Sequence, residues 1–208
     1  MSPDLAAPGF AELETGAAAR GLTVLGGFHD GRGTTILLGP DSATFWGILR
    51  ASPEADGPNP VDRWSTRVVG AWAAALGARA LFPFGTPLQP FVTWALRTGR
   101  CHVSPVGLLV HDAQGLMVSF RAALAFDHRL TLPPAPPSPC IGCPEPCRGA
   151  CPVDALAPTG YDTARCHDWL DDPRGDCMER GCAARRACPA SPDRPPAQSA
   201  HHMAHFHR

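Results

Sequence analysis

The chain has 208 residues, of which 44% are hydrophobic and 18% charged, with a formal net charge of -1. This composition is typical of one large or two small globular domains, and it excludes a disordered or fibrous chain. The charge balance argues against a nucleic-acid binder, and because all eighteen Lys or Arg residues are arginine, lysine-centred chemistry is excluded.

The first 130 residues alternate helical and strand-like patterns. In chain order we expect a helix at 10–20, strands at 22–28 and 34–38, helices at 60–76 and 87–97, and strands at 79–84, 106–110 and 116–126. The helix at 60–76 is indicated by Trp64, Val68 and Trp72 at helical spacing. The last two strands are expected to form a hairpin. This mixture predicts an α+β or α/β layer structure.

A proline-rich stretch divides the chain. Residues 132–139 hold five prolines in eight positions, a composition typical of an extended, stiff linker. The domains expected from this boundary are an α/β domain at 1–130, a linker at 131–139, a cysteine-rich module at 140–190 and a tail at 191–208 that forms a short helix.

Eight of the nine cysteines lie between Cys140 and Cys188, and Cys101 stands alone. The chain begins without an apolar signal run and has no apolar stretch long enough to span a bilayer. We therefore expect a cytoplasmic protein, in which clustered cysteines bind metal more often than they form disulfides.

The first cysteine group reads Cys140-x2-Cys143-x3-Cys147-x3-Cys151-Pro152. Bacterial ferredoxins use a similar spacing, in which three cysteines bind one [4Fe-4S] cluster and the fourth binds the neighbouring cluster. A short loop can wrap only three thiolates around one cluster. The proline after the fourth cysteine turns the chain into a short helix, which we expect at 153–156.

A second cysteine group completes the set. It comprises Cys166, Cys177, Cys182 and Cys188, the last followed by Pro189. Eight cysteines and two Cys-Pro steps predict two [4Fe-4S] clusters, one bound by Cys140, Cys143, Cys147 and Cys188, and the other by Cys151, Cys166, Cys177 and Cys182. The longer spacings leave open a three-iron cluster. Zinc sites with four thiolates and structural disulfides are the alternatives.

These cysteine groups, together with the segment Tyr-Asp-Thr-Ala-Arg-Cys at 161–166, resemble the two-cluster ferredoxin module of epoxyqueuosine reductases. In that family a Y-D-x-x-x-C segment gives the first ligand of the second half, which implies a ligand role for Cys166. The resemblance also implies that Cys151 crosses to the second cluster and that Cys188 returns to the first.

The preceding segment, 102–124, resembles cobalamin-processing proteins of the methylmalonic aciduria type C kind, which have a nitroreductase-like fold and an I-H-P-x-x-G-x-W-x-x-x-R-G pattern. The chain keeps His111, Gly115 and Arg121 and departs at Asp112, Met117 and Ala122. The resemblance implies a nitroreductase-like first domain that holds cobalamin, another corrinoid or a flavin against the three retained residues. The alternative is an ordinary hairpin with Gly115 in its turn.

Several other residues carry weaker signals. We interpret Cys101 as a buried small hydrophobe rather than a nucleophile. The terminal histidines either bind a transition metal or face water on a helix packed through Met203 and Phe206, and we favour the second interpretation; they are His201, His202, His205 and His207. Four arginines either offset cluster charge or form a docking patch: Arg148, Arg165, Arg185 and Arg186.

Together these features predict a two-cluster iron-sulfur protein that carries single electrons to a bound cofactor or a redox partner protein. A corrinoid-dependent reductase and a zinc-stapled interaction module are the alternatives. An electron-transfer protein or subunit is thus favoured over an oxidoreductase proper, and no catalytic residue is predicted. We expect neither a membrane nor a nucleic acid as partner.

Overall fold

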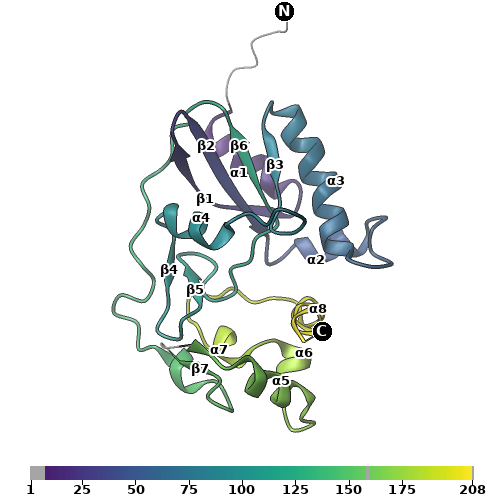
Figure 1. The fold of residues 1–208 in the computed structure, drawn as a ribbon, viewed down its shortest axis with the longest axis vertical. Helices are drawn as coiled ribbons and strands as arrows, with labels where there is room; N and C mark the ends of the chain where they lie inside the picture. Colours follow the sequence, from purple (N-terminus) through teal and green to yellow (C-terminus); the bar gives the residue numbers. More distant parts are fainter. Residues whose placement is uncertain (1–7, 158–159, 208) are drawn as a thin grey trace, which may run out of the picture. The chain divides into compact units, whose positions relative to one another are not determined.

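The computed structural model describes residues 8–157 and 160–207 (Figure 1). The chain divides into two compact units, which are described separately below. The first unit comprises Met1–Arg100 and Ser119–Ala135, and the second comprises Cys101–Val118 and Pro136–Arg208. The last residue of the expected tail, Arg208, lies outside the described residues. Helices and antiparallel strands occur together, so the predicted α+β class is confirmed at this level.

The first unit is built on a four-stranded antiparallel sheet in the order β1-β2-β6-β3. Its strands are β1 (Leu22–Asp30), β2 (Gly33–Pro40), β3 (Arg79–Leu81) and β6 (Ala122–Phe126). The hairpin of β1 and β2 pairs Leu22 with Pro40 at one end and Asp30 with Gly33 at the other, with a bulge after Val24. The short turn between Asp30 and Gly33 contains Gly31 at a φ of 58°, a conformation that glycine adopts without strain.

Four helices belong to the first unit: α1 (Phe10–Ala18), α2 (Phe45–Arg50), α3 (Pro60–Ala75) and α4 (Phe91–Arg97). Helix α3 lies alongside β3 (Figure 1). It begins at a proline, which has no amide hydrogen to leave unpaired there. Trp64, Val69 and Trp72 on α3 are buried in one core with apolar residues of the sheet. The helical spacing in the sequence predicted Trp64 and Trp72 on this face, whereas Val68, also expected there, is only partly buried against the core.

Several elements are shorter than predicted, including the first helix, which ends at Ala18 rather than at residue 20. The strand expected at 79–84 ends at Leu81, and the helix expected at 87–97 begins at Phe91. Pro90 explains the later start of this helix, because a residue that precedes a proline is disfavoured in the helical conformation. The helix can therefore propagate only after Pro90, which occupies its N-cap.

The expected hairpin of 106–110 with 116–126 is wrong. Strand β5 (Leu109–His111) pairs instead with β4 (Cys101–Val103), and β6 pairs with β2 and β3. Only an isolated bridge between His111 and Gly115 joins the two sides of the predicted turn. Every residue of β6 is buried, so this strand is favoured inside a sheet with a neighbour on each side rather than in an exposed hairpin.

The second unit consists of short elements. Besides β4 and β5 it contains η1 (Pro146–Gly149), β7 (Leu156–Ala157), β8 (Gly160–Tyr161), α5 (Thr163–Asp171), α6 (Cys177–Arg180), α7 (Ala183–Arg186) and α8 (Pro196–Phe206). The helical turn expected at 153–156 is absent, because Asp154 has a φ of 49° and the chain continues from a turn into β7. Among the described residues, the longest helix has 16 residues, and none combines the length and apolar character needed to cross a bilayer.

The division into units differs from the expected boundaries in two places, one of which is the expected linker at 131–139, which is divided between the units after Ala135. Residues 101–118 were expected in the domain at 1–130 but belong to the second unit. The physical reason is packing: Val106, Val110 and Leu116 are buried together with Cys147. Because these apolar side chains form the small core next to the first cysteine group, the segment clusters with that group rather than with the chain that precedes it.

Candidate metal centres

The loop of the first cysteine group is shaped by two tight backbone conformations. The amide of Cys143 donates to the carbonyl of Cys140 across 3.2 Å, and Gly142 in this turn has a φ of 72°. Glu145 is also left-handed, with a φ of 53°, and the following Pro146 starts η1, which carries Cys147. The chain therefore bends twice within eight residues, which brings the first three cysteines of the group around one space.

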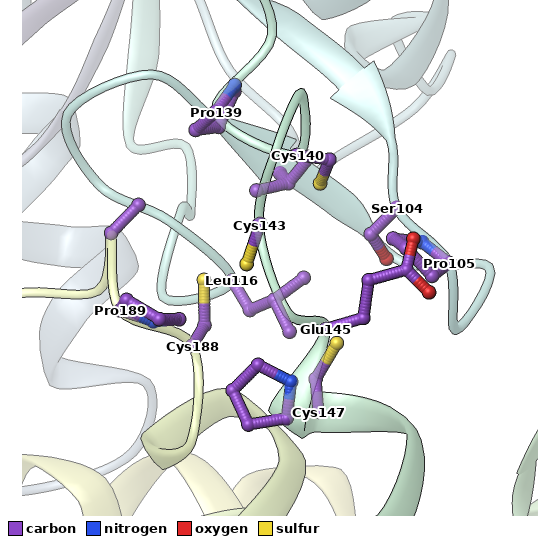
Figure 2. A pocket seen from close by; sticks show the side chains of 13 residues that line it. Ser104, Pro105, Leu116, Pro139, Cys140, Cys143, Glu145, Cys147, Cys188 and Pro189 are labelled. Atoms are coloured by element: carbon purple, nitrogen blue, oxygen red, sulfur yellow. The ribbon is translucent and has the colours of Figure 1, made fainter.

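The first three cysteines share a pocket with the last cysteine of the chain. Cys140, Cys143, Cys147 and Cys188 line it, and their sulfur atoms surround a common space beside Leu116 (Figure 2). Cys188 reaches this pocket because α7, which ends just before it, packs against η1. The pocket encloses about 370 Å³ of space that includes open solvent, and its other lining residues are mainly prolines and aliphatic side chains.

The other four cysteines line a second pocket of about 350 Å³, again with space open to solvent. These residues are Cys151, Cys166, Cys177 and Cys182. The side chain of Asp162 accepts a hydrogen bond from the amide of Arg165 at 2.9 Å and so caps α5, which carries Cys166. Cys177 is the first residue of α6, and Cys182 is the N-cap of α7. Leu156, Trp169 and Met203 supply apolar walls.

The structure thus brings the eight predicted ligands together in the two sets of four that the sequence predicted. None of the nine cysteines forms a disulfide bond. Each pocket takes three cysteines from one sequence group and one from the other, since Cys188 lies in the first pocket and Cys151 in the second. The crossing that the ferredoxin spacing implies is therefore present in the arrangement of the thiols.

The electrostatic interactions between the thiols follow the same division. Burial raises the pKa of the Cys147 thiol, and the neighbouring Cys188, Cys140 and Cys143 raise it further. Burial likewise raises the pKa of the Cys166 thiol, and its thiol neighbours are the other three cysteines of the second pocket. Burial and the mutual repulsion of thiolate charges both disfavour ionisation of these cysteines. A bound cationic group would stabilise them as thiolates.

Hydrogen-bond donors face the sulfur atoms of the second pocket. The Tyr161 hydroxyl donates to Cys166 Sγ at 3.1 Å, and the Ala155 amide donates to Cys151 Sγ at 3.3 Å. In the first pocket the lining residue Ser104 is only 6% exposed, and its Oγ has no hydrogen-bond partner among the described residues. A buried hydroxyl without a partner is costly, so its position at a pocket of four thiols fits a bound group that accepts a hydrogen bond.

Among the residues that the structure describes, no three His, Cys, Asp or Glu side chains are grouped so that they could hold a metal ion. A zinc ion draws its thiolates to one point at about 2.3 Å. In a [4Fe-4S] cluster each thiolate binds a different iron, so the four sulfur atoms need not converge on one point. The cluster assignment therefore stays a prediction that depends on the thiol sets and their apolar pockets.

Two of the three residues suggested for a corrinoid or flavin, His111 and Gly115, have local structural roles, whereas the buried Nε of Arg121 has no hydrogen-bond partner among the described residues. His111 is 1% exposed, and its Nδ1 accepts hydrogen bonds from the amides of Ala113 and Gln114 at 3.1 and 3.2 Å. Gly115 has a φ of 51°, and a Cβ there would lie 2.4 Å from the amide nitrogen of Ser191. Arg121 belongs to the first unit, whereas His111 and Gly115 belong to the second. Burial lowers the pKa of the Arg121 guanidinium.

Most of the four arginines near the cysteines pair with acidic groups. Arg148 pairs with Glu145, and Arg186 with Asp176 at 2.7 Å. Arg165 lies 3.6 Å from Asp162. Burial raises the pKa of the Cys182 thiol, and the positive charge of Arg185 partly opposes this effect. The predicted role in offsetting cluster charge is thus most direct for Arg185.

The remaining predicted positions have packing roles. Cys101 in β4 is 2% exposed, in agreement with its interpretation as a small buried residue. The terminal histidines fall on or next to α8, whose Met203 is buried and whose Phe206 packs in the same cluster, as the amphipathic interpretation predicted. His207 interacts with Asp171 at 2.7 Å.

Sequence reasoning did not identify Ser104 or the Tyr161 hydroxyl as groups of these sites. Ser104 lies 36 positions before Cys140, and its approach to the first pocket depends on the pairing of β4 with β5. Tyr161 was noted only as part of the segment that ends at Cys166. Its spacing of five residues from that cysteine was the available signal.

Comparisons with known protein families, with curated proteins and with solved structures found no match to this chain.

Proposed function

We propose that the chain binds two [4Fe-4S] clusters and carries single electrons. The observation that supports this proposal most is the division of eight cysteines into two apolar pockets of four, with one cysteine exchanged between the sequence groups. A set of unrelated structural cysteines would have no reason to divide in this way. Two clusters of the ferredoxin kind require it.

The thiols and their surroundings suit this role. Cysteine sulfur is the usual protein ligand of iron-sulfur clusters, and each cluster, when bound, accepts and releases one electron. Leu116 in the first pocket and Met203 in the second restrict the access of water, which influences the reduction potential. The Tyr161 hydroxyl and the Ala155 amide supply hydrogen bonds to thiolates, so the second pocket can stabilise added negative charge.

The finer architecture follows from the same proposal. The second unit would be a ferredoxin-like two-cluster module, and free thiols suit the reducing conditions of the cytoplasm. The electron donor or acceptor would be a redox partner protein. A nitroreductase-like first unit and a corrinoid or flavin held by His111, Gly115 and Arg121 are a separate proposal, which rests on the sequence resemblance. That interpretation stays a prediction.

The proposal is tested by the metal content of the full chain purified without oxygen. We expect about eight iron and about eight acid-labile sulfide per chain, with paramagnetic resonance signals of reduced [4Fe-4S] clusters after dithionite treatment. A colourless protein with zinc and without sulfide would contradict the proposal and favour the zinc-stapled module. About seven iron with an oxidised-state signal would assign one three-iron cluster.

A further inference from the structure

Tyr161 is the single tyrosine of the chain, and its hydroxyl lies at the second cysteine pocket. The O–H group donates to Cys166 Sγ at 3.1 Å. The residue as a whole is 37% exposed, so the ring reaches solvent while the hydroxyl is directed to a sulfur atom. A tyrosine side chain that serves only as packing would have no need of this contact.

The phenol ring is held in place by elements on both sides. Tyr161 pairs with Leu156 in the small sheet of β7 and β8. Its ring is stacked on Phe206 of α8, with the centroids 5.9 Å apart and the planes inclined by 6°. Helix α8 in turn packs on α6 and inserts Met203 into the wall of the pocket. The hydroxyl is therefore held next to the sulfur atom, because the strand pairing and the ring stacking both restrict rotation of the side chain.

We propose that the Tyr161 hydroxyl sets the reduction potential of the second cluster through its hydrogen bond to the Cys166 thiolate. This inference rests on the proposed function. Reduction adds negative charge to the cluster and its thiolates, so a donated hydrogen bond stabilises the reduced form more than the oxidised form. The potential is then more positive than it would be with an apolar ring at the same place.

The chemistry of the neighbourhood favours donation by the phenol. A phenol hydroxyl has an ordinary pKa of about 10, so near neutral pH it carries its proton and can donate a hydrogen bond. A thiolate bound to iron has no proton and can only accept. The direction of the hydrogen bond is thus fixed from tyrosine to sulfur, and the hydroxyl acts on the cluster as a positioning residue that neither transfers a proton nor binds iron.

The test is the substitution Tyr161→Phe in the full chain, which keeps the ring and its stacking on Phe206 and removes only the donor. We expect unchanged iron and sulfide contents, and a shift of one of the two reduction potentials to a more negative value. The expected size is about a tenfold change in the reduction equilibrium, or about 59 mV for one electron. Both potentials are measured by redox titration monitored by paramagnetic resonance.

Ser104→Ala is the matched control, because it removes a hydroxyl from the first pocket and leaves the second pocket intact. The potential that moves in Tyr161→Phe should keep its wild-type value in Ser104→Ala. The iron-thiolate stretching frequencies in the vibrational spectrum give a second readout. Loss of the hydrogen bond should raise one of them in Tyr161→Phe.

The outcomes separate this inference from the proposed function. A wild-type chain without iron and sulfide would overturn both. A wild-type chain with two clusters, together with unchanged potentials in a fully loaded Tyr161→Phe variant, would overturn the inference alone. A variant that loses half of its iron would also overturn it, because the hydroxyl would then be required for assembly of the site rather than for its potential.

Discussion

The two units of the chain are stabilised by different means. The first unit buries sixteen apolar residues in one cluster that includes Phe45, Trp64 and Trp72. Among the residues of the second unit that the structure describes, one apolar cluster has four buried residues and another has three, and each of them includes a cysteine. Burial of apolar area is the main stabilising contribution to folding. The first unit therefore has a large apolar core of its own, whereas under the proposed function the second would be stabilised mainly by the clusters that its thiols bind.

The helices at two of the candidate ligands are short. Helix α6, which begins at Cys177, and helix α7, whose N-cap is Cys182, have four residues each. Helices of one turn are unstable without tertiary contacts. Crosslinking by metal would replace those contacts, because ligation couples binding energy to folding.

The largest effect is expected from removal of iron. Treatment of the anaerobic protein with ferricyanide and a chelator should unfold the second unit and leave the first unit folded, because only the second needs the thiol ligands. Hydrogen exchange measured by mass spectrometry reports each unit. Amides of β1, β2 and β6 should stay protected, while those of α5, α6 and α8 should exchange rapidly. Equal loss of protection in the two units would contradict the contrast.

A smaller loss is expected from a single ligand. The substitution Cys143→Ala should remove about half of the iron and sulfide and reduce protection near the first pocket, since one thiolate of that set is lost. Cys101→Ala is the matched control, because Cys101 is buried in the same unit but lines neither cysteine pocket. It should keep the full iron content. Unchanged iron in Cys143→Ala would contradict the ligand assignment.

Sequence reasoning succeeded where the signal was local. The helix at α3 was visible from the spacing of Trp64 and Trp72. The two sets of four cysteines expected from the ferredoxin-like spacing are the sets that line the two pockets, but their role as cluster ligands stays a prediction. Sequence reasoning did not predict which distant segments pair as β-strands. β6 joins β2 and β3, and β4 joins β5, because burial decides which neighbour a strand takes. A residue pattern within one strand carries no such information.

The same reason explains what was missed at the sites. Ser104 approaches the first pocket only through the fold of residues 101–118 into the second unit. Gly115 was interpreted as part of a cofactor surface, yet its tight backbone contact is with Ser191, 76 positions further along the chain. A glycine that is required for close packing and one that is required for ligand approach look identical in the sequence.

The role of Gly115 can be tested directly. A Cβ at this position would lie 2.4 Å from the Ser191 nitrogen, and the φ of 51° disfavours any other residue. Since the Ser191 amide donates to the carbonyl of Cys188, the clash would also disturb the first pocket. We expect Gly115→Ala to lower the free energy of unfolding of the second unit by about 1–3 kcal/mol. Denaturant-dependent hydrogen exchange gives this value.

Gly149→Ala is the control for that substitution. Gly149 also lies in the second unit, but a Cβ there meets no atom within 4 Å. It should leave the unfolding free energy within about 0.5 kcal/mol of wild type. If Gly115→Ala changed the unfolding free energy as little as Gly149→Ala, the close approach of Ser191 would not constrain this position. The interpretation of Gly115 as a cofactor-facing residue would then be favoured.

The smallest effect concerns the first unit, whose stability should depend on pH through one ion pair. Arg67 donates from Nε and Nη2 to the two carboxylate oxygens of Glu54 at 2.6 and 2.8 Å and lowers the pKa of Glu54 from 4.5 to about 2. Because the folded state favours the ionised carboxylate, its stabilising contribution is complete above pH 4.5 and is lost as the pH falls towards 2.

Substitution of either partner should therefore weaken the acid dependence of the first unit. In Glu54→Gln the group that titrates is gone, and in Arg67→Gln the carboxylate loses both donors, so the melting temperature of the first unit should fall less steeply between pH 4.5 and 2 than in wild type. Arg67 is half exposed, so the effect on stability at pH 7 should be small. If the melting temperature of both variants depended on pH as steeply as that of wild type, other carboxylates would govern the acid response. The contrast between an apolar first unit and a ligand-dependent second unit would then depend on the iron experiments alone.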